Sequence, residues 1–383
     1  MLIMKRMRQD KTIEVFSLLV RAGLFGRTEG ADSLLQDGVD WAEVSKLAKE
    51  QSVVGLVAEG VEVLKGESVM KNGATLLPKE WLVKYGVATM RLEQRNQAMN
   101  KFIATLIRRM RKQGIYALLL KGQGVAQCYT KPLWRACGDV DLLLSDDDYE
   151  KARDFLTPFA SKMWLEHQYK KHLGMTIGNW LVELHGHLRC GFSFRIDKEL
   201  DKIYHDTFCA NDVTSWMNRK EEVFMLGREN DVLYVFVHFL NHFYKGGVGL
   251  RQICDWCRLL WSYRDALDLR TLESRLKKMG LMSEWRAFGA YAVEYLGMPE
   301  EAMPFYDDDE KWKRKARRIW LFILKTGNMG HNRDKGRGKV SFLTRKLRSS
   351  AQRFTDLCNH LTIFPLDTLR FLPSIFITGL RQK

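Results

Sequence analysis

The sequence contains no apolar stretch of the roughly 20 residues that a membrane-spanning helix needs. Its N-terminal segment combines basic and apolar side chains, but Glu14 and Arg21 interrupt the apolar part and make it a poor secretory signal. From these two absences we expect a cytoplasmic protein with no transmembrane segment.

A cysteine framework is also absent. The chain has seven cysteines, an odd number without regular spacing, which indicates free thiols in a reducing compartment. Cys254 and Cys257 have CxxC spacing, but the second CxxC that would complete a zinc site is missing. Because both cysteines lie in the amphipathic run LRQICDWCRLL, we interpret them as part of one helix face.

No internal repeat divides the chain, whose 383 residues suffice for two or three domains. Apolar residues show helical spacing near the N-terminus and again from about residue 215 onward, whereas short apolar runs typical of strands lie between. We predict an α+β protein with an N-terminal helical region (1–95), a core with a small mixed sheet (96–212) and a C-terminal helical region (213–383).

The core segment carries several local signals. Residues 89–114 predict a long helix that ends at a glycine. Ser145 followed by Asp148 matches a helix-capping box, so we expect a helix over 147–160. Gly178-Asn179 separates two alternating runs and predicts a two-residue hairpin loop. Two further runs are predicted to form buried strands, IYALLLKG and DVDLLLS.

Two aspartates stand one residue apart at the start of the second of these strands. Because alternate side chains of a strand share a face, Asp139 and Asp141 point the same way. Two carboxylates this close both stay ionised at neutral pH only beside positive charge. A divalent cation would supply that charge, and hard oxygen ligands suit Mg²⁺. The alternative is a surface turn, but the three leucines that follow directly favour a buried strand.

A glutamate lies inside another apolar run, WLVELHGHL. Strands disfavour glutamate, so Glu183 should have a partner, and His185 falls on the same face. If this strand lies beside the aspartates, three carboxylates converge and can hold two metal ions for in-line displacement at phosphorus. The alternative is an edge-strand glutamate that faces water.

The ordered set LLLKG, Arg135, GDVDLLL and VELH resembles the uncharacterised nucleotidyltransferases of the DNA polymerase beta superfamily. The resemblance covers about residues 95–260. It implies a small mixed sheet that carries a glycine-containing loop, an Asp-x-Asp pair and a distal third carboxylate. Lys121-Gly122 stands where kanamycin nucleotidyltransferase and its relatives have Gly-Ser.

The resemblance also implies roles for the matching residues. Asp139 and Asp141 would bind two Mg²⁺ ions, and Glu183 would complete the position of the ion that activates the attacking hydroxyl. The implied reaction is attack by an acceptor hydroxyl on the α-phosphorus of a nucleoside triphosphate, with release of pyrophosphate. The acceptor, whether a small molecule, a sugar or a protein side chain, is left open. The nucleotide would be bound by Lys121, Gly122, Gln123, Gly124, Arg135 and Gly138, with Lys121 and Arg135 as candidates to neutralise phosphate charge.

Histidines are secondary candidates. His172 could line the mouth of the cleft, and His185 could orient Glu183, accept a proton or make a structural hydrogen bond. His238 and His242 share a helix face, but the glutamate that a zinc-protease motif needs after the first histidine is missing. We interpret this pair as helix packing or as a polar contact with the core.

Positive charge is concentrated near the C-terminus. Residues 311–353 contain fifteen Lys or Arg and one acid, Asp334, so they carry nearly all of the net charge of +15. This segment could bind nucleic acid, an anionic surface or the triphosphate, or it could be a solvated surface. The apolar end of the chain, FPLDTLRFLPSIFITGL, is interpreted as a packed helix rather than a membrane-facing one.

Three functions compete at this point. The leading hypothesis is a Mg²⁺-dependent nucleotidyltransferase. The second is a catalytically weak nucleotide-binding or regulatory module that uses the same pocket. The third is a nucleic-acid-binding protein that uses residues 311–353 and whose affinity falls steeply with salt.

Overall fold

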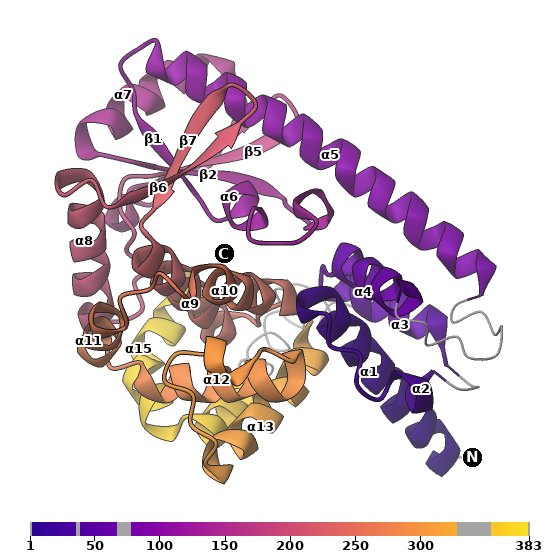
Figure 1. The fold of residues 1–383 in the computed structure, drawn as a ribbon. Helices are drawn as coiled ribbons and strands as arrows, with labels where there is room; N and C mark the ends of the chain where they lie inside the picture. Colours follow the sequence, from indigo (N-terminus) through magenta and orange to yellow (C-terminus); the bar gives the residue numbers. More distant parts are fainter. Residues whose placement is uncertain (1, 36–38, 67–77, 328–353, 382–383) are drawn as a thin grey trace, which may run out of the picture.

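The computed structural model describes residues 2–35, 39–66, 78–327 and 354–381, and its centre is a mixed sheet of seven strands (Figure 1). The strand order is β3-β4-β5-β2-β1-β7-β6. β2 runs parallel to β5 and β1 parallel to β7, while the other neighbours are antiparallel. The predicted α+β fold with a mixed sheet is therefore confirmed. The strands are β1 (Ala117–Leu120), β2 (Asp139–Leu144), β3 (Ala160–Met163), β4 (His172–Ile177), β5 (Trp180–His185), β6 (Val213–Asn218) and β7 (Glu221–Leu226).

The N-terminal region is helical as predicted, but its last helix is longer than expected and enters the core. The predicted helix over 89–114 is part of α5 (Lys79–Arg111), so the division at residue 95 falls inside one continuous helix. Gly114 follows it with φ 68°, a conformation that glycine adopts without steric cost. The preceding helices are α1 (Leu2–Phe25), α2 (Ala31–Leu34), α3 (Trp41–Glu50) and α4 (Val54–Gly66).

Most local signals of the core are confirmed. Ser145 caps α7 (Asp146–Leu156) by accepting a hydrogen bond from the backbone N–H of Asp148 at 3.2 Å. The helix ends earlier than predicted, because Pro158 follows and residues from Ala160 onward form β3. The loop between β4 and β5 is Gly178-Asn179, as predicted, with Gly178 at φ 58°.

The prediction of a helical pattern from about residue 215 was wrong for β6 and β7. These strands form a hairpin whose loop is Arg219-Lys220, and Arg219 adopts φ 60°. Because this loop lacks the glycine or asparagine that usually marks a tight turn, no hairpin was predicted here. The sheet therefore continues past the boundary expected at residue 212, with Phe224 of β7 opposite Leu118 of β1.

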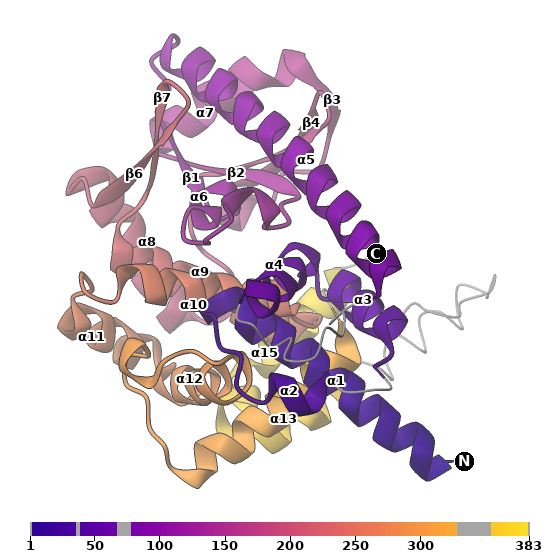
Figure 2. The same cartoon turned by 45° about the vertical axis from the view of Figure 1, so that its right-hand side comes forward.

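Helices cover both faces of the sheet (Figures 1 and 2). On one face, Val140 and Leu142 of β2 share a core with Ile103 and Ile107 of α5. On the other face, Leu143 belongs to a larger core that includes residues of α9 (Arg228–Lys245) and α10 (Leu250–Tyr263). Asp139 and Asp141 alternate with Val140 and Leu142, so they point toward the α9 side.

The C-terminal helices pack against the N-terminal ones. The larger core contains buried residues of α1, such as Phe16, together with Trp256 of α10 and Phe288 of α12. Cys254 and Cys257 lie buried in this core as free thiols, which confirms their interpretation as part of a helix face. Further helices are α6 (Gly122–Ala126), α8 (Phe194–Cys209), α11 (Leu269–Met279), α12 (Met282–Leu296), α13 (Glu310–Thr326) and α15 (Pro365–Arg381), and residues 354–363 are also helical.

The apolar end of the chain forms a packed helix, as predicted. Phe371 of α15 is fully buried and stacks on Phe192 with ring centres 3.9 Å apart. Arg370 donates hydrogen bonds to the backbone oxygens of Met279 and Gly280. Across the described ranges, no helix has the length and apolar character needed to cross a membrane.

The buried Glu284 of α12 predicts a pH dependence of stability. Burial and then the nearby Asp367 raise its pKa to about 8, and Tyr244 donates a hydrogen bond to its Oε1 at 3.2 Å. The folded protein therefore holds a proton that the unfolded chain releases near pH 4. As pH rises between these two values, this group should lower the free energy of unfolding by about 1.4 kcal/mol per pH unit.

Glu284→Gln keeps the shape of the side chain but cannot ionise. Urea titrations at pH 5 and pH 8.5 should show a smaller loss of stability for the variant than for the wild type. Glu273→Gln on α11, whose side chain is 42% exposed, is the control and should follow the wild type. Equal losses for Glu284→Gln and the wild type would mean that Glu284 is already ionised at low pH.

Candidate active site

Pairing between β2 and β5 brings the three predicted carboxylates together. The two strands are parallel, with Asp141 opposite Glu183 and Asp139 opposite Leu181. Residues opposite each other point to the same face, so all three carboxylates lie on the α9 side of the sheet. One oxygen atom from each carboxylate lies within 4.8 Å of an oxygen atom of each of the other two. The geometric expectation drawn from the sequence is therefore met, although the catalytic role of these residues stays a prediction.

Asp141 is the most buried of the three, with 1% of its surface exposed. Its Oδ1 lies 3.2 Å from Lys121 Nζ and 3.0 Å from His185 Nε2. Burial alone would raise the pKa of Asp141, but Lys121 and His185 outweigh burial and hold the pKa well below its usual range. Asp141 is therefore a carboxylate at neutral pH.

The negative charge of the cluster is only partly balanced. Repulsion by Asp141, followed by burial, raises the pKa of Asp139 despite the nearby Lys121. Burial opposes the charge of Lys121, but the carboxylates outweigh it and raise the pKa of the lysine. Burial lowers the pKa of His185, which favours a neutral imidazole. A site with this surplus of oxygen ligands and negative charge suits a divalent cation.

Lys121 reaches the cluster from the end of β1 through an uncommon backbone conformation. Its φ is 53° and its ψ is −140°, a region that residues other than glycine rarely adopt. Gly122 follows with φ 50°, and a Cβ there would lie 3.6 Å from the backbone oxygen of Asp139. The Lys-Gly pair thus turns the chain sharply beside the start of β2.

The rest of the predicted nucleotide loop divides between the interior and the surface. Gln123 is buried and donates a hydrogen bond to Asn96 Oδ1 at 2.8 Å. Gly124 faces Met225, whose sulfur would lie 2.6 Å from an added Cβ. Gly138 is exposed directly before Asp139. Packing in the interior therefore explains why Gln123 and Gly124 occupy these positions. Gly122 and Gly138 instead border the carboxylates.

Arg135 was predicted to contact a phosphate, but the structure pairs its side chain with a carboxylate. Its guanidinium makes two hydrogen bonds to the carboxylate of Asp255, at 2.8 and 2.6 Å, in the protein interior. Tyr129 also donates to Asp255 at 2.8 Å. The sequence could not indicate this pairing, because Asp255 lies 120 residues away on α10. A phosphate could engage the same groups of Arg135 only by breaking a buried ion pair.

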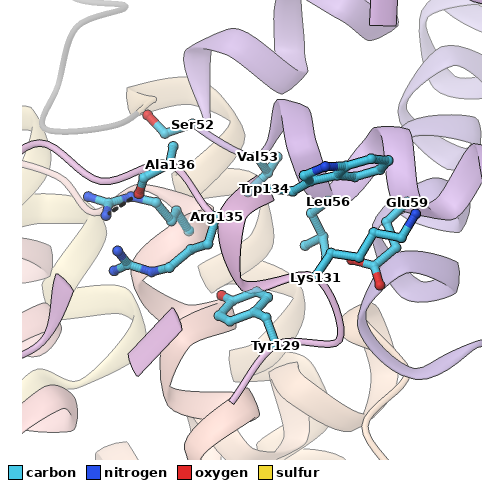
Figure 3. Close-up of a pocket in the computed structure, with 10 residues that line it drawn as sticks. Ser52, Val53, Leu56, Glu59, Tyr129, Lys131, Trp134, Arg135 and Ala136 are labelled. Carbon is cyan, nitrogen blue, oxygen red and sulfur yellow. Dashed lines mark hydrogen bonds between the residues drawn. The ribbon is translucent and has the colours of Figure 1, made fainter. Parts of the chain in front are cut away.

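Arg135 also lines a small pocket beside α4, together with Tyr129, Lys131, Trp134 and Glu59 (Figure 3). Its volume is about 10 Å³, room for about one water molecule. The side chains of the acidic cluster do not line it. The pocket is therefore too small for a nucleotide, and the candidate site lies elsewhere.

Helix α9 carries two neighbouring histidines on the side of the sheet that bears the acidic cluster. His238 Nε2 lies 3.2 Å from His242 Nε2. Burial and the charge of Lys121 lower the pKa of both, to about 4 for His242. Tyr234, one turn earlier, has its ring centre 6.0 Å from Lys121 Nζ. The two histidines share a face of α9, as predicted, and Tyr234 on the same helix approaches Lys121.

His172 is the remaining predicted histidine. It lies on β4 directly opposite His185, and its Nε2 is 3.0 Å from Glu183 Oε2. About a third of the His172 side chain is exposed, compared with 12% for His185. His172 therefore stands at the solvent side of the cluster, as expected of a residue at its mouth.

The comparison with known families agrees with this arrangement. A family model described as uncharacterised nucleotidyltransferase matches residues 37–297. This chain belongs to that family. The matched range contains the whole sheet and the acidic cluster, and it supports a role in nucleotidyl transfer. Searches of curated proteins and of solved structures gave no match.

The buried pair of Arg135 and Asp255 yields a test of what Arg135 does. Arg135→Met leaves Asp255 without its main partner in the interior, so the free energy of unfolding should fall by about 3–5 kcal/mol. The double variant Arg135→Met/Asp255→Leu removes both charges. Its free energy of unfolding, measured by urea unfolding, should fall by less than that of Arg135→Met. Unchanged stability with weakened nucleotide binding would instead support the phosphate contact.

Proposed function

We propose that this protein is a Mg²⁺-dependent nucleotidyltransferase that moves a nucleoside monophosphate from a nucleoside triphosphate to a hydroxyl acceptor. The observation that carries this proposal is the convergence of Asp139, Asp141 and Glu183 on one face of the sheet, in a chain of the nucleotidyltransferase family. The acceptor oxygen would form a bond to the α-phosphorus while the bond between the α-phosphorus and the oxygen that bridges it to the β-phosphorus breaks, releasing pyrophosphate and the hydroxyl proton.

The residues present fit Mg²⁺. Asp139, Asp141 and Glu183 supply hard oxygen ligands, and the raised pKa of Asp139 reflects negative charge that the protein's own cations leave unbalanced. When bound, Mg²⁺ would neutralise charge on the phosphoryl oxygens and favour ionisation of the acceptor hydroxyl. Glu183 is more exposed than Asp141, so it would lie on the side from which the acceptor arrives.

Lys121 would change partners during the reaction. It bonds Asp141 at 3.2 Å, and a cation bound by Asp141 would weaken that ion pair through repulsion. The ammonium group would then be available for a phosphate oxygen, as proposed from the family resemblance. His172 and His185, which lie 3.0 and 3.8 Å from Glu183 Oε2, would hold Glu183 in position.

The basic C-terminal segment adds little to this proposal. Of residues 311–353, the structure describes 311–327, and the remainder lies outside the described residues. Within α13, Arg314, Arg317 and Arg318 are exposed, whereas Trp312 and Trp320 are buried and do not offer a stacking surface for bases. Binding of nucleic acid or an anionic surface by 311–353 stays a prediction.

The proposal predicts the loss of activity on neutralising either aspartate. Asp139→Asn and Asp141→Asn should each lower transfer of α-labelled nucleotide by about 100-fold or more, because charge stabilisation at the phosphoryl group is lost. Pyrophosphate release, measured with Mg²⁺ and each of the four common nucleoside triphosphates, is the acceptor-independent readout.

Asp265→Asn is the matched control, since its side chain is 85% exposed and lies outside the site. This variant should keep wild-type activity. Transfer that survives both Asp139→Asn and Asp141→Asn would refute the proposal. Tight nucleotide binding by the wild type without any pyrophosphate release would favour the binding-module alternative.

A further inference from the structure

A second group of ligand atoms adjoins the three carboxylates. His172 of β4 pairs with His185 of β5, and Glu183 lies two residues before His185, so all three side chains share a face of the sheet. One ligand atom from each lies within 4.8 Å of the other two. Gly174, which is opposite Glu183 on β4, has no side chain, and Glu183 turns to its diagonal neighbour His172 instead.

We propose that His172, Glu183 and His185 form a second cation position, which selects a divalent first-row transition metal over Mg²⁺. The inference extends the proposed function, because it names the metal class at one position of the same centre. Glu183 belongs to both positions: with Asp139 and Asp141 it completes an all-oxygen set, and with the histidines it completes a nitrogen-rich set.

The chemistry of the donors separates the two positions. Carboxylate oxygens suit Mg²⁺, whereas imidazole nitrogens suit Zn²⁺ and other first-row transition metals. Two histidines with one carboxylate therefore form a set that Mg²⁺ occupies poorly.

The distances fit ligation by one ion. Metal–ligand bonds of about 2.0–2.2 Å at tetrahedral or octahedral angles put neighbouring ligand atoms about 3.0–3.6 Å apart. His172 Nε2 lies 3.0 Å from Glu183 Oε2, at the lower end of that interval, and His185 Nε2 lies 3.8 Å from it, slightly beyond the upper end. His185 Nε2 also lies 3.0 Å from Asp141 Oδ1, so ligation would replace that hydrogen bond with a bond to the ion, whose charge would compensate Asp141. With that exchange, small rotations of the side chains bring the three atoms around one ion.

Access also differs between the positions. Relative side-chain exposure is 32% for His172 and 24% for Glu183, compared with 1% for Asp141. The position with the histidines is therefore the outer one, open to a cation from solvent. A metal bound there would also fix the carboxylate of Glu183 for the inner position.

The test uses Co²⁺ as a spectroscopic probe on the full-length protein. Co²⁺ with imidazole ligands gives visible d–d absorption, which reports binding without any enzymatic activity. In the presence of a large excess of Mg²⁺, the wild type should still bind Co²⁺. His172→Gln should weaken Co²⁺ binding at least about tenfold. His205→Gln is the matched control, because His205 is 71% exposed on α8, and it should bind Co²⁺ like the wild type.

A second measurement keeps the test independent of folding defects. Electron spin-echo spectra of bound Mn²⁺ should show coupling to histidine nitrogen in the wild type and in Asp139→Asn, and lose part of it in His172→Gln. Displacement of Co²⁺ by equimolar Mg²⁺, or equal Co²⁺ affinity in the wild type and His172→Gln, would overturn the inference. Nucleotidyl transfer with Mg²⁺ would then still stand, whereas nitrogen-ligated metal without any transfer would overturn the proposed function alone.

Discussion

The buried charge of Asp141 is the constraint on which the site depends. A carboxylate in the middle of a sheet, with 1% of its surface exposed, is costly unless partners surround it. Lys121 and His185 supply those partners at 3.2 and 3.0 Å. Their positions account for two otherwise unfavourable features, the uncommon backbone of Lys121 and a histidine in an apolar strand.

The sheet topology brings the side chains around Asp141 together from different parts of the chain. The end of β1 brings Lys121, the parallel pairing of β2 with β5 brings Glu183 and His185, and β4 adds His172. Helix α9 closes the same side with His238. Side-chain exposure falls from 32% for His172 through 24% for Glu183 and 12% for His185 to 1% for Asp141, a gradient that suits an ion held against a phosphate arriving from solvent.

The sequence correctly predicted those features that depend on residues close together in the chain. The Asp-x-Asp strand, the Gly178-Asn179 hairpin and the Ser145 cap depend on short-range geometry, and all three are present. Two features were not predictable, because they depend on distant partners. The β6–β7 hairpin turns at Arg219 without a glycine, and Arg135 is bound by Asp255, 120 residues away. The convergence of Glu183 with the aspartates was inferred because glutamate is uncommon inside an apolar strand and should have a partner there. This inference used the chemistry of one side chain and not the periodicity from which the fold was predicted.

The central claim is that three carboxylates from β2 and β5 hold a divalent cation against the phosphates of a nucleotide. A crystal structure of the full chain with Mn²⁺ and a non-hydrolysable nucleoside triphosphate analogue tests it most directly, with the ion located by anomalous scattering. The account predicts an ion about 2.0–2.5 Å from oxygens of Asp139, Asp141 and Glu183 that also contacts the triphosphate. A triphosphate bound away from this cluster, with no ion between the three carboxylates, would contradict it.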